Sequence, residues 1–302
     1  MQLVQRGSSN IVNGHLKGAM TVLASGPRVS TPTGQFLERA FRFYDVIAAL
    51  SLGTAPNTAS QPIPGPFSYP PSYESTSSPL NNVDTLLGLA TDLWPIIHRL
   101  SHLLSYKNSL ESTILAGQTN KASFLRTELE LSSQAIERAL IDWQPPIFPE
   151  NEFEDPQHRL NEDTRMQSIL NNAEAYRHSA FVYLYRTIHE LPRSHAPVQH
   201  HTHLSLLACA NVVQLSEQCS DGPMSALLWP LFVASCEAST EEDRAMAITA
   251  FGGTERRQGM NNIARAWEVV KEVWRRSDEA EGEIDINWRD ICREREFSIV
   301  FG

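Results

Sequence analysis

Four histidines lie close together in the sequence and are the first candidates for chemistry: His195, His200, His201 and His203. If this segment is helical, His200 and His203 share one face, and neutral imidazoles are good ligands for Zn, Cu or Ni. A metal site needs a third or fourth ligand with matching geometry, and no such residue stands at a recognisable offset. We therefore expect a structural or solvated role for these histidines, with neither a metal nor a cofactor.

Motifs that would indicate catalysis or phosphate binding are absent from the sequence. There is no GxSxG nucleophile elbow, no GxxxxGK[ST] phosphate loop and no GxGxxG fingerprint. The pair Gly252 and Gly253 is interpreted as a C-cap that ends a helix after Phe251. We predict that the chain is not an enzyme.

The densest apolar stretch runs from residue 227 to residue 234 and reads LLWPLFVA. It has more apolar side chains than one helix face requires, so we interpret it as a central helix that crosses the core. The alternative is the wall of an apolar ligand pocket or an interaction groove. Trp229, Phe232 and Cys236 are the lining residues expected for such a pocket.

The composition excludes several classes of protein. With 41% hydrophobic and 20% charged residues, the chain has the balance of a folded globular protein. A formal net charge of −10 makes it a poor direct binder of nucleic acid, because phosphate binding needs clustered Lys and Arg. The four cysteines match neither a zinc-binding spacing nor a disulfide framework, so we expect reduced and mostly buried thiols. They are Cys209, Cys219, Cys236 and Cys292.

Targeting and membrane segments are not expected. Residues after Met1 lack the continuous apolar core of a secretory signal, which predicts a protein that stays inside the cell. The longest apolar stretch, residues 226–236, is about half as long as the roughly 20 residues that a membrane-spanning helix requires. We predict no membrane association.

Apolar residues recur at three- and four-residue steps in most of the chain, which predicts an all-α protein built as an irregular multi-helix array. No segment shows sustained strand alternation, and no fixed repeat period is present. Pro95 is expected to kink or restart the second of the helices. The expected helical segments are 36–52, 84–107, 122–143, 173–191, 199–218 and 263–274.

One further helix is expected to begin near Thr240. Ser239 and Glu242 have the spacing of a capping box, and the acidic residues 241–243 suit the positive end of a helix dipole. Glu237 lies close in the sequence to Glu241 and Asp243. We interpret these neighbouring carboxylates as groups that cap the helix and interact with its dipole, and not as a catalytic pair.

Two proline-containing segments divide the chain. Length alone allows one large helical domain or two closely packed halves. The expected organisation is N-terminal helices in 1–52, a long Pro/Ser-rich loop in 53–81, helices in 82–144, a linker in 145–163 and a C-terminal helical half in 164–302.

Residues 226–244, ALLWPLFVASCEASTEEDR, resemble the signature of the fungal-specific transcription factor domain. The resemblance is to the subgroup found C-terminal to Zn2Cys6 DNA-binding modules, and it covers nearly the whole chain, 1–302. The string LWPLFVASCE followed by EDR is its most specific part. Supporting matches are 15–19 (HLKGA), 43–46 (FYDV), 87–90 (LGLA), 93–100 (LWPIIHRL), 183–186 (YLYR), 273–274 (VW) and 288–292 (WRDIC).

The resemblance implies an all-helical regulatory module of a nuclear transcriptional regulator that responds to protein contacts or to small molecules. It favours control of a secondary-metabolite or other pathway gene cluster. Relatives read DNA through a six-cysteine array, which these residues lack, so we expect no direct DNA binding from this chain. A truncated gene model, a shortened paralogue and a regulator that acts through a partner all remain open.

The alternative function is a helical scaffold or dominant-negative partner that sequesters full-length regulators. The expected partners are other transcription factors, a second copy in a homodimer, or an apolar small molecule.

Overall fold

A computed structural model describes residues 14–19, 21, 32–57, 83–84, 87–145, 156–218, 227–280, 285–299 and 301. All regular secondary structure in these ranges is helical, which confirms the all-α prediction. The predicted Pro/Ser-rich loop lies outside the described residues except for 53–57. The helices are α2 (Pro32–Leu52), α3 (Trp94–Leu115), α4 (Thr119–Asp142), α5 (Pro156–Tyr183), η2 (Leu184–Ile188), α6 (Ala196–Gln218), α7 (Leu228–Glu237), α8 (Glu241–Gln258), α9 (Asn261–Glu279) and α10 (Trp288–Glu294).

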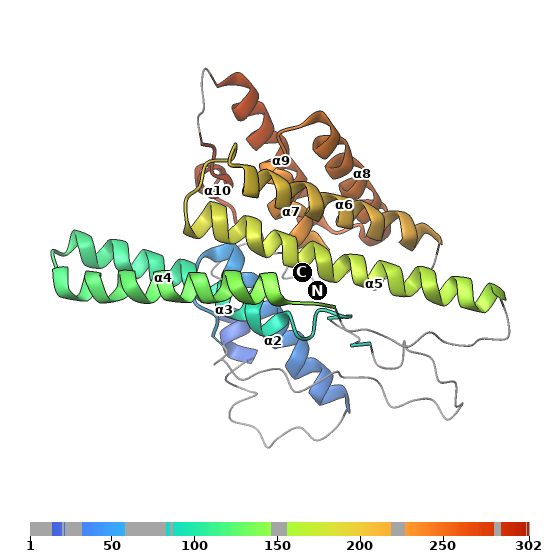
Figure 1. Cartoon of the computed structure of the whole chain (residues 1–302), viewed down its shortest axis with the longest axis horizontal. Helices are drawn as coiled ribbons and strands as arrows, with labels where there is room; N and C mark the ends of the chain where they lie inside the picture. The colour runs from blue at the N-terminus through green and yellow to red at the C-terminus, as the bar shows by residue number, and fades with distance from the viewer. Residues whose placement is uncertain are drawn as a thin grey trace.

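The long helix α5 runs through the middle of the molecule (Figure 1). Its most extensive contacts are with α6, and α7 also packs against it. Helices α6 to α10 lie on one side of α5, while α2, α3 and α4 lie on the other (Figure 1). One continuous cluster of buried apolar side chains joins both sides, so the helices from α2 to α10 share one main core, with a small second cluster around Leu16 and Ala48.

Helix α7 crosses the interior, as its composition predicts. All ten of its residues are buried, including Trp229 and Phe232. A helix that is apolar on every side is stable only when neighbouring elements cover it all round. Helices α5, α6, α8 and α9 all contact α7.

The predicted helix over residues 84–107 is only partly correct, because α3 begins at Trp94. The residues before it form turns, and the Asp84 carboxylate accepts a hydrogen bond of 2.8 Å from the backbone N–H of Leu87. Pro95 occupies the first turn of α3, where its missing N–H costs nothing. The predicted restart at Pro95 is therefore the true beginning of the helix.

Helix α8 begins where predicted, but its capping residue differs. The hydroxyl oxygen of Thr240 accepts a hydrogen bond of 3.1 Å from the backbone N–H of Asp243. The predicted capping box with Ser239 and Glu242 does not form, because the N-cap position is occupied by Thr240, one residue later. The Ser239 hydroxyl instead donates to Gln199 of α6 at 2.5 Å.

The predicted end of this helix after Phe251 is wrong. Helix α8 continues through Gly252 and Gly253 to Gln258, and Gly259 is the C-cap, with a positive φ of 58°. Gly253 is present for a different reason. A Cβ atom built on it would lie 2.2 Å from a methyl carbon of Val213, so the glycine allows α6 and α8 to approach closely.

The predicted linker over 145–163 is too long, because α5 begins at Pro156. Its first turns have few apolar residues, so their sequence carries little helical periodicity. At its other end, α5 widens into the π-helical turn η2, where the sequence predicted an uninterrupted helix. Such wide turns redirect side chains and are frequent at functional sites.

Candidate functional site

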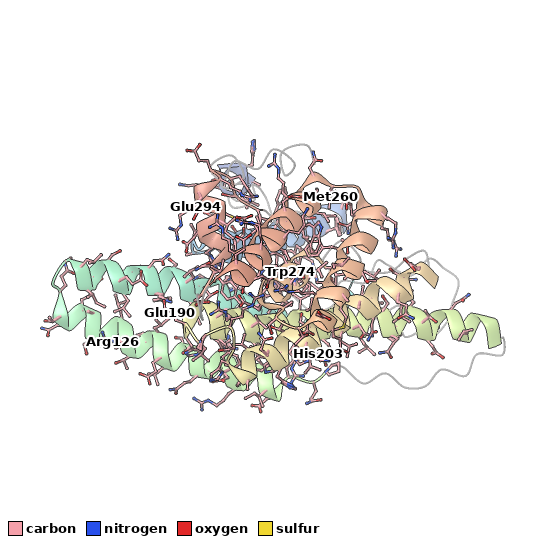
Figure 2. All side chains as sticks on the ribbon, turned by 90° about the horizontal axis from the view of Figure 1, so that it is seen from above. Arg126, Glu190, His203, Met260, Trp274 and Glu294 are labelled. Carbon is pink, nitrogen blue, oxygen red and sulfur yellow. The ribbon has the colours of Figure 1, made fainter. Side chains whose placement is uncertain are left out.

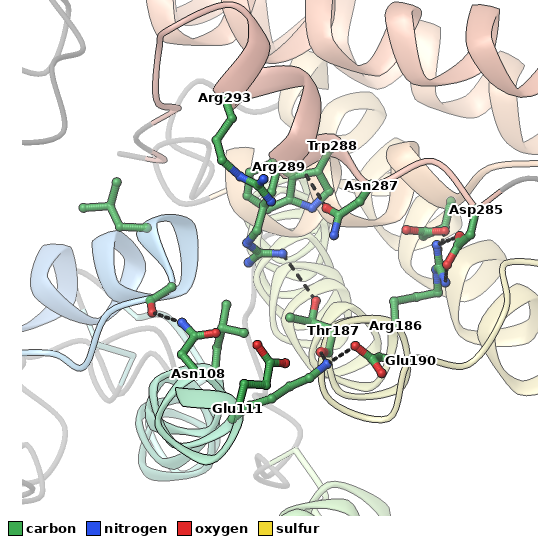
Figure 3. Close-up of a pocket in the computed structure, with 15 residues that line it drawn as sticks. Asn108, Glu111, Arg186, Thr187, Glu190, Asp285, Asn287, Trp288, Arg289 and Arg293 are labelled. Carbon is green, nitrogen blue, oxygen red and sulfur yellow. Dashed lines mark hydrogen bonds and ion pairs between the residues drawn. The ribbon is translucent and has the colours of Figure 1, made fainter. Parts of the chain in front are cut away.

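A cavity of about 450 Å³ lies where α2, α3, η2, α7 and α10 meet (Figure 3). Its volume falls in the range that accommodates small molecules. The wall is largely polar and combines residues from distant parts of the chain. Its basic residues are Lys107, Arg186, Arg289 and Arg293, and its acidic residues are Glu111, Glu190, Glu237 and Asp285.

Arg186 forms the most enclosed ion-pair network of the wall. Its Nε donates to Glu237 at 2.7 Å, and its Nη1 donates to Asp285 at 3.0 Å. Nη1 also donates to the carbonyl oxygen of Leu191 at 2.5 Å. The side chains of Arg186 and Glu237 are 9% and 8% exposed, and burial raises the pKa of Glu237. These contacts tie η2 to the end of α7, so Arg186 is already neutralised by protein groups.

Arg289 projects from α10 and has no carboxylate partner among the described residues. Its Nη2 donates to the carbonyl oxygen of Leu50 at 2.9 Å and to the hydroxyl of Tyr183 at 3.2 Å. The guanidinium carbon lies 4.1 Å from the centre of the Trp288 ring and 5.3 Å from that of Tyr183. Aromatic faces and neutral acceptors hold the group in place but leave its positive charge uncompensated.

The facing wall comes from α3 and the residues after η2. Lys107 donates to the carbonyl oxygen of Thr187 at 2.9 Å and to the carboxylate of Glu190 at 2.5 Å. Glu111, one turn further along α3, is exposed and makes no ion pair within the described ranges. Figure 3 shows its carboxylate directed towards the space that Arg289 enters from α10. The cavity thus has one uncompensated cation and one uncompensated anion on opposite sides.

The three predicted pocket residues of α7 lie in the packed interior. Trp229, Phe232 and Cys236 are 1%, 0% and 2% exposed. Phe232 packs against the rings of Trp288 and Phe301, with centroids 5.1 and 4.9 Å away, and burial raises the pKa of Cys236. None of the three lines the 450 Å³ cavity or the neighbouring cavity of about 300 Å³. Their role in ligand binding remains a prediction.

Two of the clustered histidines, His201 and His203, make separate contacts with other helices. His201 Nδ1 lies 2.9 Å from Nδ1 of His178 on α5, and its ring stacks on Phe181. His203 points elsewhere and pairs with Asp243 at 2.8 Å. Among the residues that the structure describes, no three His, Cys, Asp or Glu side chains are arranged to hold a metal ion.

Burial and nearby positive groups lower the pKa of both members of the His178–His201 pair. The pKa of His178 falls to about 3 and that of His201 to about 4. The pair is therefore neutral near pH 7 and can share one N–H between its two facing nitrogens. Its place between α5 and α6 indicates a structural role at the most extensive helix contact of the fold.

Sequence reasoning missed the polar cavity and its two central arginines. Arg186 and Arg289 both lie in segments that carry the family resemblance, 183–186 and 288–292. Those strings were a usable signal that the residues matter. Their roles required the fold, because Arg186 and Asp285 are 99 positions apart.

The sequence was compared with models of protein families, with curated proteins and with solved structures. The model of the fungal specific transcription factor domain matches residues 2–302. No curated protein and no solved structure matches the chain. Across the described helices, none has the length and apolar character needed to cross a membrane. The match over almost the whole chain confirms the resemblance carried by residues 226–244, and the chain belongs to the family of fungal-specific transcription factor domains, as a transcriptional regulator of the fungal type.

Proposed function

We propose that this chain is the sensing and contact domain of a nuclear regulator that controls a pathway gene set, such as a secondary-metabolite cluster. It binds a small polar molecule in the 450 Å³ cavity and transmits that event through contacts with other proteins. The family match supports the regulatory role, and the cavity supports the sensing role.

The uncompensated charge of Arg289 carries the proposal. An anionic group of a ligand would pair with this guanidinium, and a hydrogen-bond donor or cationic group would face Glu111. The ligand class is therefore a small organic anion that also carries a donor, for example an amino acid. Such a molecule would bridge α3 and α10 and favour the conformation in which these helices face each other.

An apolar ligand at Trp229, Phe232 and Cys236 remains a separate proposal. Because all three side chains are nearly inaccessible, such a ligand would have to displace neighbouring core residues on entry. The polar cavity requires no such displacement.

A transcription reporter tests the sensing role. The full chain is fused to an unrelated DNA-binding module, and reporter output is measured while single amino acids and small carboxylates are supplied. We expect at least one compound to change the output, and Glu111→Gln to weaken that response without lowering protein abundance. Ser112→Ala, an exposed neighbour outside the cavity wall, is the control.

Direct binding separates sensing from transcription. Thermal unfolding of the purified chain is measured with the same compounds, because a ligand of the folded state raises the midpoint. A reporter that responds equally in wild type and in Glu111→Gln, with no compound raising the midpoint, would contradict sensing at this cavity.

The second function that we propose is a scaffold that sequesters full-length regulators. It is favoured by the exposed apolar residues of the α3–α4 pair, which projects from the body of the molecule (Figures 1 and 2). Co-expression with a related full-length factor should then reduce that factor's output in proportion to the amount of this chain.

A further inference from the structure

Helices α3 and α4 form an arm that extends away from the remaining helices (Figures 1 and 2). Helix α4 packs extensively on α3 and makes few contacts with α5 and η2. The helices that the structure describes therefore leave one long side of α4 uncovered. We infer that this side binds α4 of a second copy of the chain, antiparallel and about a two-fold axis.

The free side carries large apolar residues at heptad spacing. Phe124 and Leu131 are 64% and 54% exposed, and Arg138 follows seven residues later. Residues seven apart lie on nearly the same face of a helix. The buried residues of α4, Ile136 and Leu140 among them, face α3 and the core on the other side. The apolar strip thus lies opposite the surface that holds α4 in the fold.

Two opposite charges lie beside the strip, at the two ends of α4. Lys121 lies in the first turn of the helix, and Asp142 is its last residue. A second α4 in the antiparallel direction places each of these charges beside its opposite. A parallel pair would place like charges together, so the pattern favours an antiparallel copy.

A two-fold axis also fixes the register. Leu131 lies next to the midpoint of α4, so an axis through it pairs Leu131 with its own copy. The same register brings Phe124 beside Arg138 of the second chain, a cation–π arrangement. It also brings Lys121 within one residue of the position opposite Asp142 of the second chain, and both residues are exposed and make no ion pair among the described residues.

This self-complementarity is the reason for choosing a second copy over an unrelated partner. An unrelated helix requires only one matching charge pattern, whereas a homodimer requires the strip to match itself when reversed. Helix α4 is about 36 Å long at 1.5 Å per residue, which permits contact over several turns. The inference does not depend on ligand binding in the cavity.

A charge-swap experiment tests the pairing with the full chain. Lys121→Glu and Asp142→Lys are prepared separately, and the mass of each is measured by sedimentation at about 1 to 100 µM. Each variant alone should dimerise several-fold more weakly than wild type, because two attractive pairs become repulsive. Mixing the two variants should restore dimers, since both pairs in the mixed dimer are then opposite in charge.

Matched controls lie on the same helix but off the strip. Arg126→Glu and Glu130→Lys make the same charge changes and should leave the dimer affinity within about twofold of wild type. Leu131→Lys should weaken dimerisation by roughly tenfold or more. Circular dichroism verifies that all variants remain folded.

Two outcomes would overturn the inference. One is a wild-type chain that remains monomeric at 100 µM. The other is a dimer that neither Leu131→Lys nor the charge variants weaken, which would place the dimer contact on another surface. Recovery of dimers only in the mixture supports the antiparallel register directly.

Discussion

Adjacent glycines in α8 should respond to alanine in opposite directions. Alanine normally stabilises a helix relative to glycine by about 1 kcal/mol. At Gly252 the nearest atom to an added Cβ is the Arg256 guanidinium at 3.6 Å, an ordinary contact. At Gly253 the added Cβ would lie 2.2 Å from a methyl carbon of Val213, so α6 and α8 would have to separate.

The expected changes in the free energy of unfolding can be compared because both glycines lie in the same helix. The propensity gain is common to both substitutions, so the difference between the two variants measures the contact with Val213. Inserting a methyl group into a packed interior costs about 1 to 3 kcal/mol. Gly252→Ala should therefore gain about 0.5 to 1 kcal/mol, while Gly253→Ala should be neutral to about 2 kcal/mol less stable than wild type.

Urea unfolding followed by far-ultraviolet circular dichroism is the appropriate assay. The midpoints are compared only if the slopes agree, because equal slopes indicate the same exposed surface on unfolding. The double variant Gly253→Ala/Val213→Ala adds a test, since removing the valine methyl groups should reduce the penalty of the added Cβ.

The reasoning would be refuted by equal stabilisation in both glycine variants. That result would mean that α6 and α8 have room for a methyl group at Gly253. Both helices would then lie farther apart than the close approach described above.

Three other perturbations have defined outcomes. His178 and His201 have folded-state pKa values below the usual 6.5, so the free energy of unfolding should fall as the pH drops from about 6.5 towards 4, by about 2 kcal/mol per histidine at pH 5; replacing both with glutamine should flatten this urea-unfolding profile. Arg186→Met should destabilise by about 3 to 5 kcal/mol by leaving the Glu237 carboxylate buried without its partner, and restoration by Glu237→Gln in the same chain, measured by thermal unfolding, would support that cause. Thr240→Ala should cost about 1 kcal/mol in urea unfolding as α8 loses its cap, and an unchanged midpoint would count against the cap.

Local sequence pattern determined most of the helices of this protein. The apolar density of α7 predicted its burial, and the spacing of Ile263, Val270 and Trp274 predicted α9. Both rest on the helical period, which a linear sequence records directly. Two of the errors involve residues that make contacts with distant parts of the chain: the Ser239 hydroxyl donates to Gln199 of α6, and Gly253 allows α6 to approach α8 closely.

The polar cavity was decided by the tertiary structure alone. Arg186 meets Glu237 and Asp285 across 51 and 99 positions, and Arg289 reaches the carbonyl oxygen of Leu50 from the other end of the chain. No spacing rule links such positions, because their separation depends on how the intervening helices pack. The sequence specified which segments are helical and which faces are buried. Whether a charge in the fold is compensated depends on distances in space, which only the packed helices establish.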